Sequence, residues 1–237
     1  MTSPDRAPSK PTDPAGATAE ERAALGWTHS ARFLTTASRL DQLPPPDRPE
    51  TAFVGRSNAG KSTAINTLAQ VRRLAFASKT PGRTQHINLF ELGPPDAPDA
   101  LWTDLPGYGY AAVARDAKLR WQQVMADYLA HRSALAGVVM MVDSRHGFTP
   151  LDRQLLDFVA QRVGNGEVKL LVLLTKADKL SRNEGAKALM AAQKVLGELA
   201  TDAADISITL FSALTRQGLG DAAVTLHAWN RRSRAST

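Results

Sequence analysis

GRSNAGKS occupies residues 55–62 and follows a short apolar strand at 51–54. It matches G-x-x-x-x-G-K-[ST], in which glycines let backbone N–H groups turn inward around a phosphate. Lys61 is predicted to reach the β and γ phosphates and Ser62 to bind Mg²⁺, while the following helix adds its N-terminal dipole. The predicted phosphate cradle is Gly55-Arg56-Ser57-Asn58-Ala59-Gly60-Lys61-Ser62.

Downstream of this loop, apolar runs alternate with amphipathic segments. The near-continuous apolar runs at 136–142 and 168–174 suit strands that are buried on both faces of a parallel sheet. The alternation predicts an α/β fold of the P-loop NTPase type, with a mostly parallel, doubly wound sheet and helices on both faces. Further strands are expected at 87–92, 100–103 and 206–211, and helices at 61–69, 117–131, 150–163, 183–199 and 219–232.

Composition limits the remaining possibilities. The chain has 237 residues, no cysteine and a formal net charge of +6. Without cysteine, disulfides and thiolate metal sites are excluded, and no apolar run reaches the ~18 residues that a membrane helix needs. A cytoplasmic protein is therefore expected. The basic balance favours polyanionic partners, or it reflects only a solvated face.

The domain organisation is simple. We expect a disordered Pro/Ser-rich tail at 1–22, one domain at 23–232 and a short basic tail at 233–237. The lead-in after the N-terminal tail is either helical or extended. A stiff proline-rich connector at 43–49 then precedes the first core strand.

Asp104-Leu105-Pro106-Gly107 follows the strand predicted at 100–103. An acidic residue at such a strand end holds Mg²⁺ through water in P-loop proteins. The Gly107 amide is free to meet a γ-phosphate. Alone, D-x-x-G is a common turn, but downstream of a phosphate-binding loop it predicts the second phosphate motif.

Thr175-Lys176-Ala177-Asp178 ends the strand predicted at 168–174. The Asp178 carboxylate is predicted to accept hydrogen bonds from N1–H and the N2 amine of guanine. Adenine offers no such donor pair and would leave the charge unpaired. Phe211-Ser212-Ala213 ends the last strand and resembles the guanine box whose backbone amide meets O6. These motifs predict a Ras-like G domain that binds GTP and GDP.

The segment at 78–85 is polar and contains a Pro-Gly turn, and no acidic residue lies between Ser62 and Glu91. We predict a mobile loop in which a threonine completes the Mg²⁺ shell when the γ-phosphate is present. Chemistry alone allows Thr80 or Thr84. A basic solvated loop is the alternative.

With these motifs in place, the sequence resembles the EngB family of bacterial GTPases, also called YihA or YsxC, of the TrmE–Era–EngA–EngB–septin superfamily. The resemblance covers residues 25–232 and is carried by the loops quoted above together with Tyr108-Gly109-Tyr110. It implies that Thr84, with Ser62, is the Mg²⁺ ligand. The nucleotide-binding part of the switch loop is then Gly82-Arg83-Thr84-Gln85-His86.

The resemblance also implies a biological role. Members of the family act in assembly of the large ribosomal subunit and in normal cell division and septation. The expected partners are GTP or GDP and the large ribosomal subunit or its rRNA. A monomer without integral membrane contact is expected.

Two residues bear on catalysis. Ras-like GTPases place a glutamine just after D-x-x-G to orient the attacking water, and this chain has Tyr108 there. Asn58 occupies the position at which relatives hold a potassium ion. The expected catalytic residues are Lys61, Thr84 and Asn58, with slow hydrolysis raised by potassium or a ribosomal partner. For Gln85, His86 and His146 a structural role is expected.

The sequence also allows other functions. In a nucleotide-gated rRNA-binding module, hydrolysis would be only a timer, and Arg115, Lys118, Arg120 and the basic run at 231–234 would contact phosphates. A P-loop ATPase or small-molecule kinase conflicts with Asp178. A septation protein that acts at the membrane surface is another possibility, but the sequence shows no amphipathic basic helix or lipidation signal that would support a direct anchor.

Overall fold

The structure, a computed structural model, describes residues 17–75, 86–109 and 115–235. Its strands are Arg32–Ala37 (β1), Glu50–Gly55 (β2), Ile87–Leu92 (β3), Ala100–Asp104 (β4), Leu135–Asp143 (β5), Lys169–Thr175 (β6) and Ile206–Leu210 (β7). Its α-helices are Ala19–Thr28 (α1), Lys61–Leu68 (α2), Arg115–His131 (α3), Pro150–Gly164 (α4), Arg182–Leu196 (α5) and Leu219–Ala235 (α6). Short 3₁₀ turns lie at Leu40–Gln42, Ala177–Lys179 and Gly197–Leu199.

The strands form one sheet in the order β1-β3-β4-β2-β5-β6-β7. β4, β2, β5, β6 and β7 pair in parallel, whereas β3 runs antiparallel to both of its neighbours. The chain extends the sheet to one side of β2 through β4 and to the other through β5. Ligands of open α/β sheets bind at the carboxyl ends of the strands where the strand order changes direction in this way. The predicted α/β fold is confirmed.

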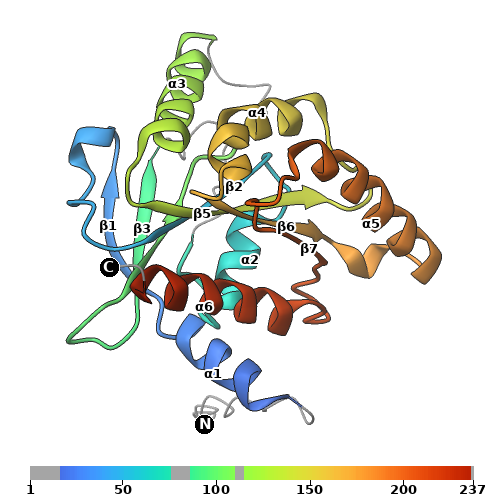
Figure 1. The fold of residues 1–237 in the computed structure, drawn as a ribbon, viewed down its shortest axis with the longest axis horizontal. Helices are drawn as coiled ribbons and strands as arrows, with labels where there is room; N and C mark the ends of the chain where they lie inside the picture. Colours follow the sequence, from blue (N-terminus) through green and yellow to red (C-terminus); the bar gives the residue numbers. More distant parts are fainter. Residues whose placement is uncertain (1–16, 76–85, 110–114, 236–237) are drawn as a thin grey trace, which may run out of the picture.

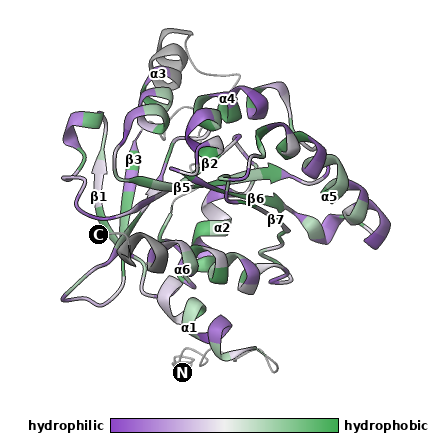
Figure 2. Cartoon of the chain, viewed as in Figure 1, coloured by the Kyte–Doolittle hydropathy of each residue, from purple (hydrophilic) through white to green (hydrophobic). Residues whose placement is uncertain are grey.

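Helices cover both faces of the sheet (Figure 1). α3, α4 and α5 pack into one apolar core, and α2 and α6 pack into the other. Successive residues of β5 point into opposite cores, Val138 and Met140 into the first and Val139 and Met141 into the second. This explains the unbroken apolar run, which appears as green strands in the middle of the molecule in Figure 2.

The lead-in to the core is both helical and extended. α1 packs against α6, and β1 joins the edge of the sheet beside β3. Because α1 begins at Ala19, the ordered domain starts before the expected boundary at residue 23. Likewise, α6 runs to Ala235, so the expected short tail at 233–237 largely continues the last helix. Residues 1–16 of the expected disordered tail lie outside the described residues.

Candidate functional site

The loop between β2 and α2 lies at the carboxyl edge of the sheet. β2 ends at Gly55 and α2 begins at Lys61, so the first amides of α2 point back toward the loop. Gly60 precedes the helix with a φ of 95°, a left-handed conformation that glycine adopts without strain. Free N–H groups and the helix dipole make such an N-terminus suited to phosphate.

The D-x-x-G segment lies directly against this loop. The Ser57 amide donates to the Tyr108 carbonyl at 2.8 Å, and the Tyr108 amide donates to the Gly55 carbonyl at 3.3 Å. At the start of the segment, the carboxylate of Asp104 forms an ion pair with the Lys61 ammonium. Both side chains are nearly buried, at 2% and 10% exposure. The predicted phosphate lysine therefore has a carboxylate partner within the site.

The segment after β6 is tied to the same loop from the other side. The Thr175 hydroxyl donates to the Ala59 carbonyl at 2.6 Å. The Lys176 ammonium donates to the Asn58 carbonyl at 2.7 Å. Two successive residues therefore hold the predicted base-reading segment against the predicted phosphate cradle.

Asp178 and Ser212 meet beside this segment. The Ser212 hydroxyl donates to Oδ1 of Asp178 at 2.7 Å, and the Lys179 ammonium lies 3.2 Å from Oδ2. The hydrogen bond from Ser212, followed by that from Lys179, lowers the pKa of Asp178 below its ordinary value. The Ala177 amide donates to the Phe211 carbonyl at 3.1 Å, which joins the loops after β6 and β7. Asp178 is thus an oriented, ionised acceptor.

Tyr108 is engaged by a residue of α4. Its side chain is buried, and its hydroxyl donates to Oδ1 of Asp152 at 2.7 Å. Asp152 also completes the capping box of α4 with Thr149, so the contact fixes the loop to that helix. Burial, with the charge of Asp152, raises the pKa of Tyr108 well above its ordinary value, and the phenol stays a neutral donor.

The two histidines for which a structural role is expected each lie beside a polar side chain. His86 Nδ1 lies 2.8 Å from the Ser38 hydroxyl, next to β1. His146 Nδ1 lies 3.6 Å from Oδ1 of Asp143, and its side chain is largely exposed. Gly82, Arg83, Thr84 and Gln85, with the alternative Thr80, lie outside the described residues.

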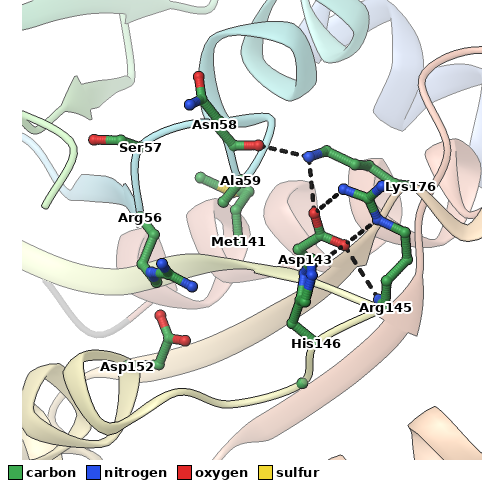
Figure 3. Close-up of a pocket in the computed structure, with 11 residues that line it drawn as sticks. Arg56, Ser57, Asn58, Ala59, Met141, Asp143, Arg145, His146, Asp152 and Lys176 are labelled. Carbon is green, nitrogen blue, oxygen red and sulfur yellow. Dashed lines mark hydrogen bonds and ion pairs between the residues drawn. The ribbon is translucent and has the colours of Figure 1, made fainter. Parts of the chain in front are cut away.

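Sequence reasoning did not find a set of residues beside the P-loop, namely Met141, Asp143, Arg145, Gly147 and Asp152. A cavity of about 190 Å³ lies there, and Figure 3 shows its lining. Asp143 stands in its centre, and Arg56 points toward Asp152 at one end. Asp143 ends β5, so the rule that loops at the carboxyl edge carry function would have singled it out. The lining is Arg56, Ser57, Asn58, Ala59, Met141, Asp143, Arg145, His146, Gly147, Asp152 and Lys176.

Comparison with known proteins finds a family model and close relatives of this chain. Residues 50–176 match the family model described as 50S ribosome-binding GTPase. A probable GTP-binding protein EngB of Albidiferax ferrireducens is 59% identical over 208 residues, which cover 87% of this chain and 96% of that protein. Its counterpart in Polaromonas sp. is 54% identical over 223 residues, 94% of this chain and 88% of that protein.

Solved structures share the fold at lower identity. A crystal structure of a probable GTP-binding protein engB is 21% identical, with a TM-score of 0.57, and covers 77% of this chain and 99% of that one. Era in complex with MgGDPNP and nucleotides 1506–1542 of 16S ribosomal RNA is 19% identical, with a TM-score of 0.57, over 76% of this chain and 56% of that one.

The fold and the loops at its carboxyl edge define a P-loop GTPase, a protein that binds GTP and hydrolyses it. Identity above 50% over most of the chain then narrows the class to one family. The chain belongs to the EngB family of GTP-binding proteins. In the part of the chain that the structure describes, no helix is both long and apolar enough to cross a membrane.

Proposed function

We propose that this GTPase is a switch in assembly of the large ribosomal subunit, with a role in normal cell division and septation. The observation that carries the proposal is the match of residues 50–176 to the 50S ribosome-binding GTPases. A net charge of +6 supports an RNA partner, and Era, which shares the fold, has been solved with ribosomal RNA.

The proposed nucleotide contacts follow from the loop positions. The P-loop amides and Lys61 bind the phosphates, Asp178 accepts from N1–H and N2 of guanine, and the Ala213 amide meets O6. The hydroxyl of Ser62, at the start of α2, and the nearby Asp104 carboxylate are hard oxygen donors, which suit Mg²⁺. Ser62 and Thr84 would hold the ion directly and Asp104 through water. Mg²⁺ would neutralise charge that develops on the phosphates.

Hydrolysis then needs a group that compensates charge near the γ-phosphate. Tyr108 does not serve, because its hydroxyl is engaged by Asp152. Asn58 lies exposed on the P-loop, and Figure 3 shows its side-chain amide turned away from Lys176. We propose that this amide helps to bind potassium, which supplies charge that an arginine finger supplies elsewhere. A ribosomal partner is the other source of such charge.

Potassium is therefore expected to raise the turnover of GTP relative to sodium by up to roughly 100-fold, the effect of adding one charge-stabilising group. Asn58→Gly should lose this response while binding GDP with wild-type affinity within about threefold, because Asn58 meets Lys176 through its backbone carbonyl and glycine keeps the left-handed φ of 66° without strain. Steady-state phosphate release in matched potassium and sodium buffers measures the effect. Equal rates in the two buffers for the wild-type protein would show that potassium takes no part in hydrolysis.

The ribosomal role is tested by co-sedimentation with purified 50S particles. The protein bound to a non-hydrolysable GTP analogue should sediment with the particles, and the GDP form should remain in the supernatant. A salt series should weaken binding steeply, because phosphate contacts release counterions. Equal binding of both nucleotide forms would show that the nucleotide does not control binding to the particle. Binding of neither form would leave the role in septation as the remaining proposal.

A second candidate is a nucleotide-gated rRNA-binding module in which hydrolysis is only a timer. The basic residues at the start of α3 and the end of α6 favour it. The same co-sedimentation, repeated with naked rRNA, separates the two. The module should bind naked rRNA as well as it binds the particle, whereas the switch should prefer the assembled particle.

A further inference from the structure

One carboxylate at the end of β5 holds two cations at once. Lys176 Nζ lies 2.8 Å from Oδ2 of Asp143. Arg145 approaches from the other side, with Nε 2.9 Å from Oδ1 and Nη2 2.7 Å from Oδ2. Figure 3 shows Asp143 between these two side chains, with its carboxylate facing both. The side chain of Asp143 is only 13% exposed, whereas that of Arg145 is 43% exposed.

Lys176 carries this contact to the P-loop. The same ammonium that meets Asp143 donates to the Asn58 carbonyl at 2.7 Å. Asn58 and Lys176 both have a left-handed backbone, with φ of 66° and 59°. Such a conformation costs a non-glycine residue energy and persists only where its surroundings impose it. The Lys176 ammonium is the group that joins these two strained positions.

Fixing a lysine side chain in one conformation costs free energy. Its stem has many rotamers, and its compact ammonium loses hydration when it is fixed against a carbonyl. A charged acceptor on the opposite side compensates for both costs. Burial alone would raise the pKa of Asp143, but hydrogen bonds from Arg145 and Lys176 outweigh it and hold the pKa well below its ordinary value. Asp143 therefore stays ionised at neutral pH.

We propose that Asp143 is a positioning residue for guanine nucleotide binding, which acts by holding the Lys176 ammonium against the Asn58 carbonyl. The contact sets the spacing between the loop that cradles phosphate and the segment that reads the base. The inference rests on the proposed roles of these two loops. Asp143 itself touches no nucleotide, and Arg145 orients its carboxylate from the solvent side.

The test is a double-mutant cycle on release of fluorescent GDP, followed by stopped flow after a chase with unlabelled GDP. Asp143→Asn is nearly isosteric and removes the charge. It should speed release by about tenfold, in the range of coupled neighbours. In a Lys176→Met background, Asp143→Asn should add no further change. Arg145→Ala is the matched control at the same carboxylate and should alter release less than about threefold.

Each result has a separate meaning. If Asp143→Asn speeds release equally with and without Lys176, or if Arg145→Ala matches it, the carboxylate merely orders its own loop and the inference is wrong. If Lys176→Met leaves release unchanged, the proposed role of residues 175–178 fails first, and the inference fails with it. If Asp143→Asn does not fold, GDP release is measured for Asp143→Glu, which keeps the charge but displaces it. This variant should also speed release with Lys176 present and add no further change in the Lys176→Met background.

Discussion

Asp178→Asn is expected to transfer the preference of the protein from GTP to xanthosine triphosphate. Guanine presents two donors to the carboxylate, whereas xanthine has a carbonyl where guanine has its N2 amine. An asparagine amide supplies one acceptor and one donor and therefore matches xanthine. Sites built on such hydrogen bonds discriminate by roughly 10⁴-fold, so the ratio of the two affinities should shift by about that factor.

The neighbours of Asp178 support this exchange. Ser212 already donates to Oδ1, and the asparagine oxygen can keep that bond. Lys179, which lies near Oδ2, is largely exposed and free to turn away from the new NH₂ group. Ser212→Ala is the matched control, because it keeps the charge and removes one orienting donor. It should weaken GTP binding roughly tenfold without any gain for the xanthine nucleotide. A mutant of Asp178 that still prefers GTP would show that the base is read elsewhere.

Lys61→Ala is expected to lower the turnover of GTP by at least about 100-fold, the loss seen when one group that stabilises developing negative charge is removed. Lys61 forms an ion pair with Asp104. We expect phosphate to replace that carboxylate as the partner of the lysine, which frees Asp104 to act on Mg²⁺. Single-turnover phosphate release at saturating GTP measures the loss. A rate near wild type would exclude Lys61 from the transition state.

Folding must be separated from catalysis in that variant. Lys61→Ala leaves Asp104 buried without its cation, which destabilises a protein whatever the site does. Lys61→Arg keeps a cation beside Asp104, but its planar guanidinium cannot replace the compact ammonium at the phosphates. The arginine variant should melt near the wild-type temperature yet remain at least about tenfold slower in hydrolysis. If hydrolysis follows melting temperature across both variants, the loss is structural.

The fold was predictable where the hydrophobic pattern had one reading. The runs that became β5 and β6 are apolar throughout because an apolar core lies on each face of the sheet. Such an unbroken apolar run is typical of a strand that is buried on both faces. β1 was not assigned, because it is an edge strand with mixed burial and its pairing with β3 depends on residues far along the chain. Local signals carry no information on such a partner. The last helix was expected to end at residue 232, but the polar residues that follow continue α6 to Ala235.

The candidate site divides in the same way. Its motif residues are adjacent in sequence, so GRSNAGKS and the segment at 175–178 could be found by reading alone. The contacts that join them are not local. The ion pair of Lys176 with Asp143 links β6 to β5, and the hydrogen bond of Tyr108 with Asp152 links a phosphate-loop neighbour to α4. Such pairs emerge only when the parallel strands bring their carboxyl ends together.

Competition for labelled GDP tests the central claim, that these loops form one guanine nucleotide site, most directly. The wild-type protein is loaded with fluorescent GDP and titrated with unlabelled GTP or ATP in the presence of Mg²⁺. Unlabelled GTP should displace the label at a concentration similar to that of the label, whereas ATP should fail at about a 1,000-fold excess, because adenine offers the Asp178 carboxylate no donor pair like N1–H and N2 of guanine. Displacement by ATP at the same concentration as GTP would contradict the assignment of Asp178 and with it the account of the site.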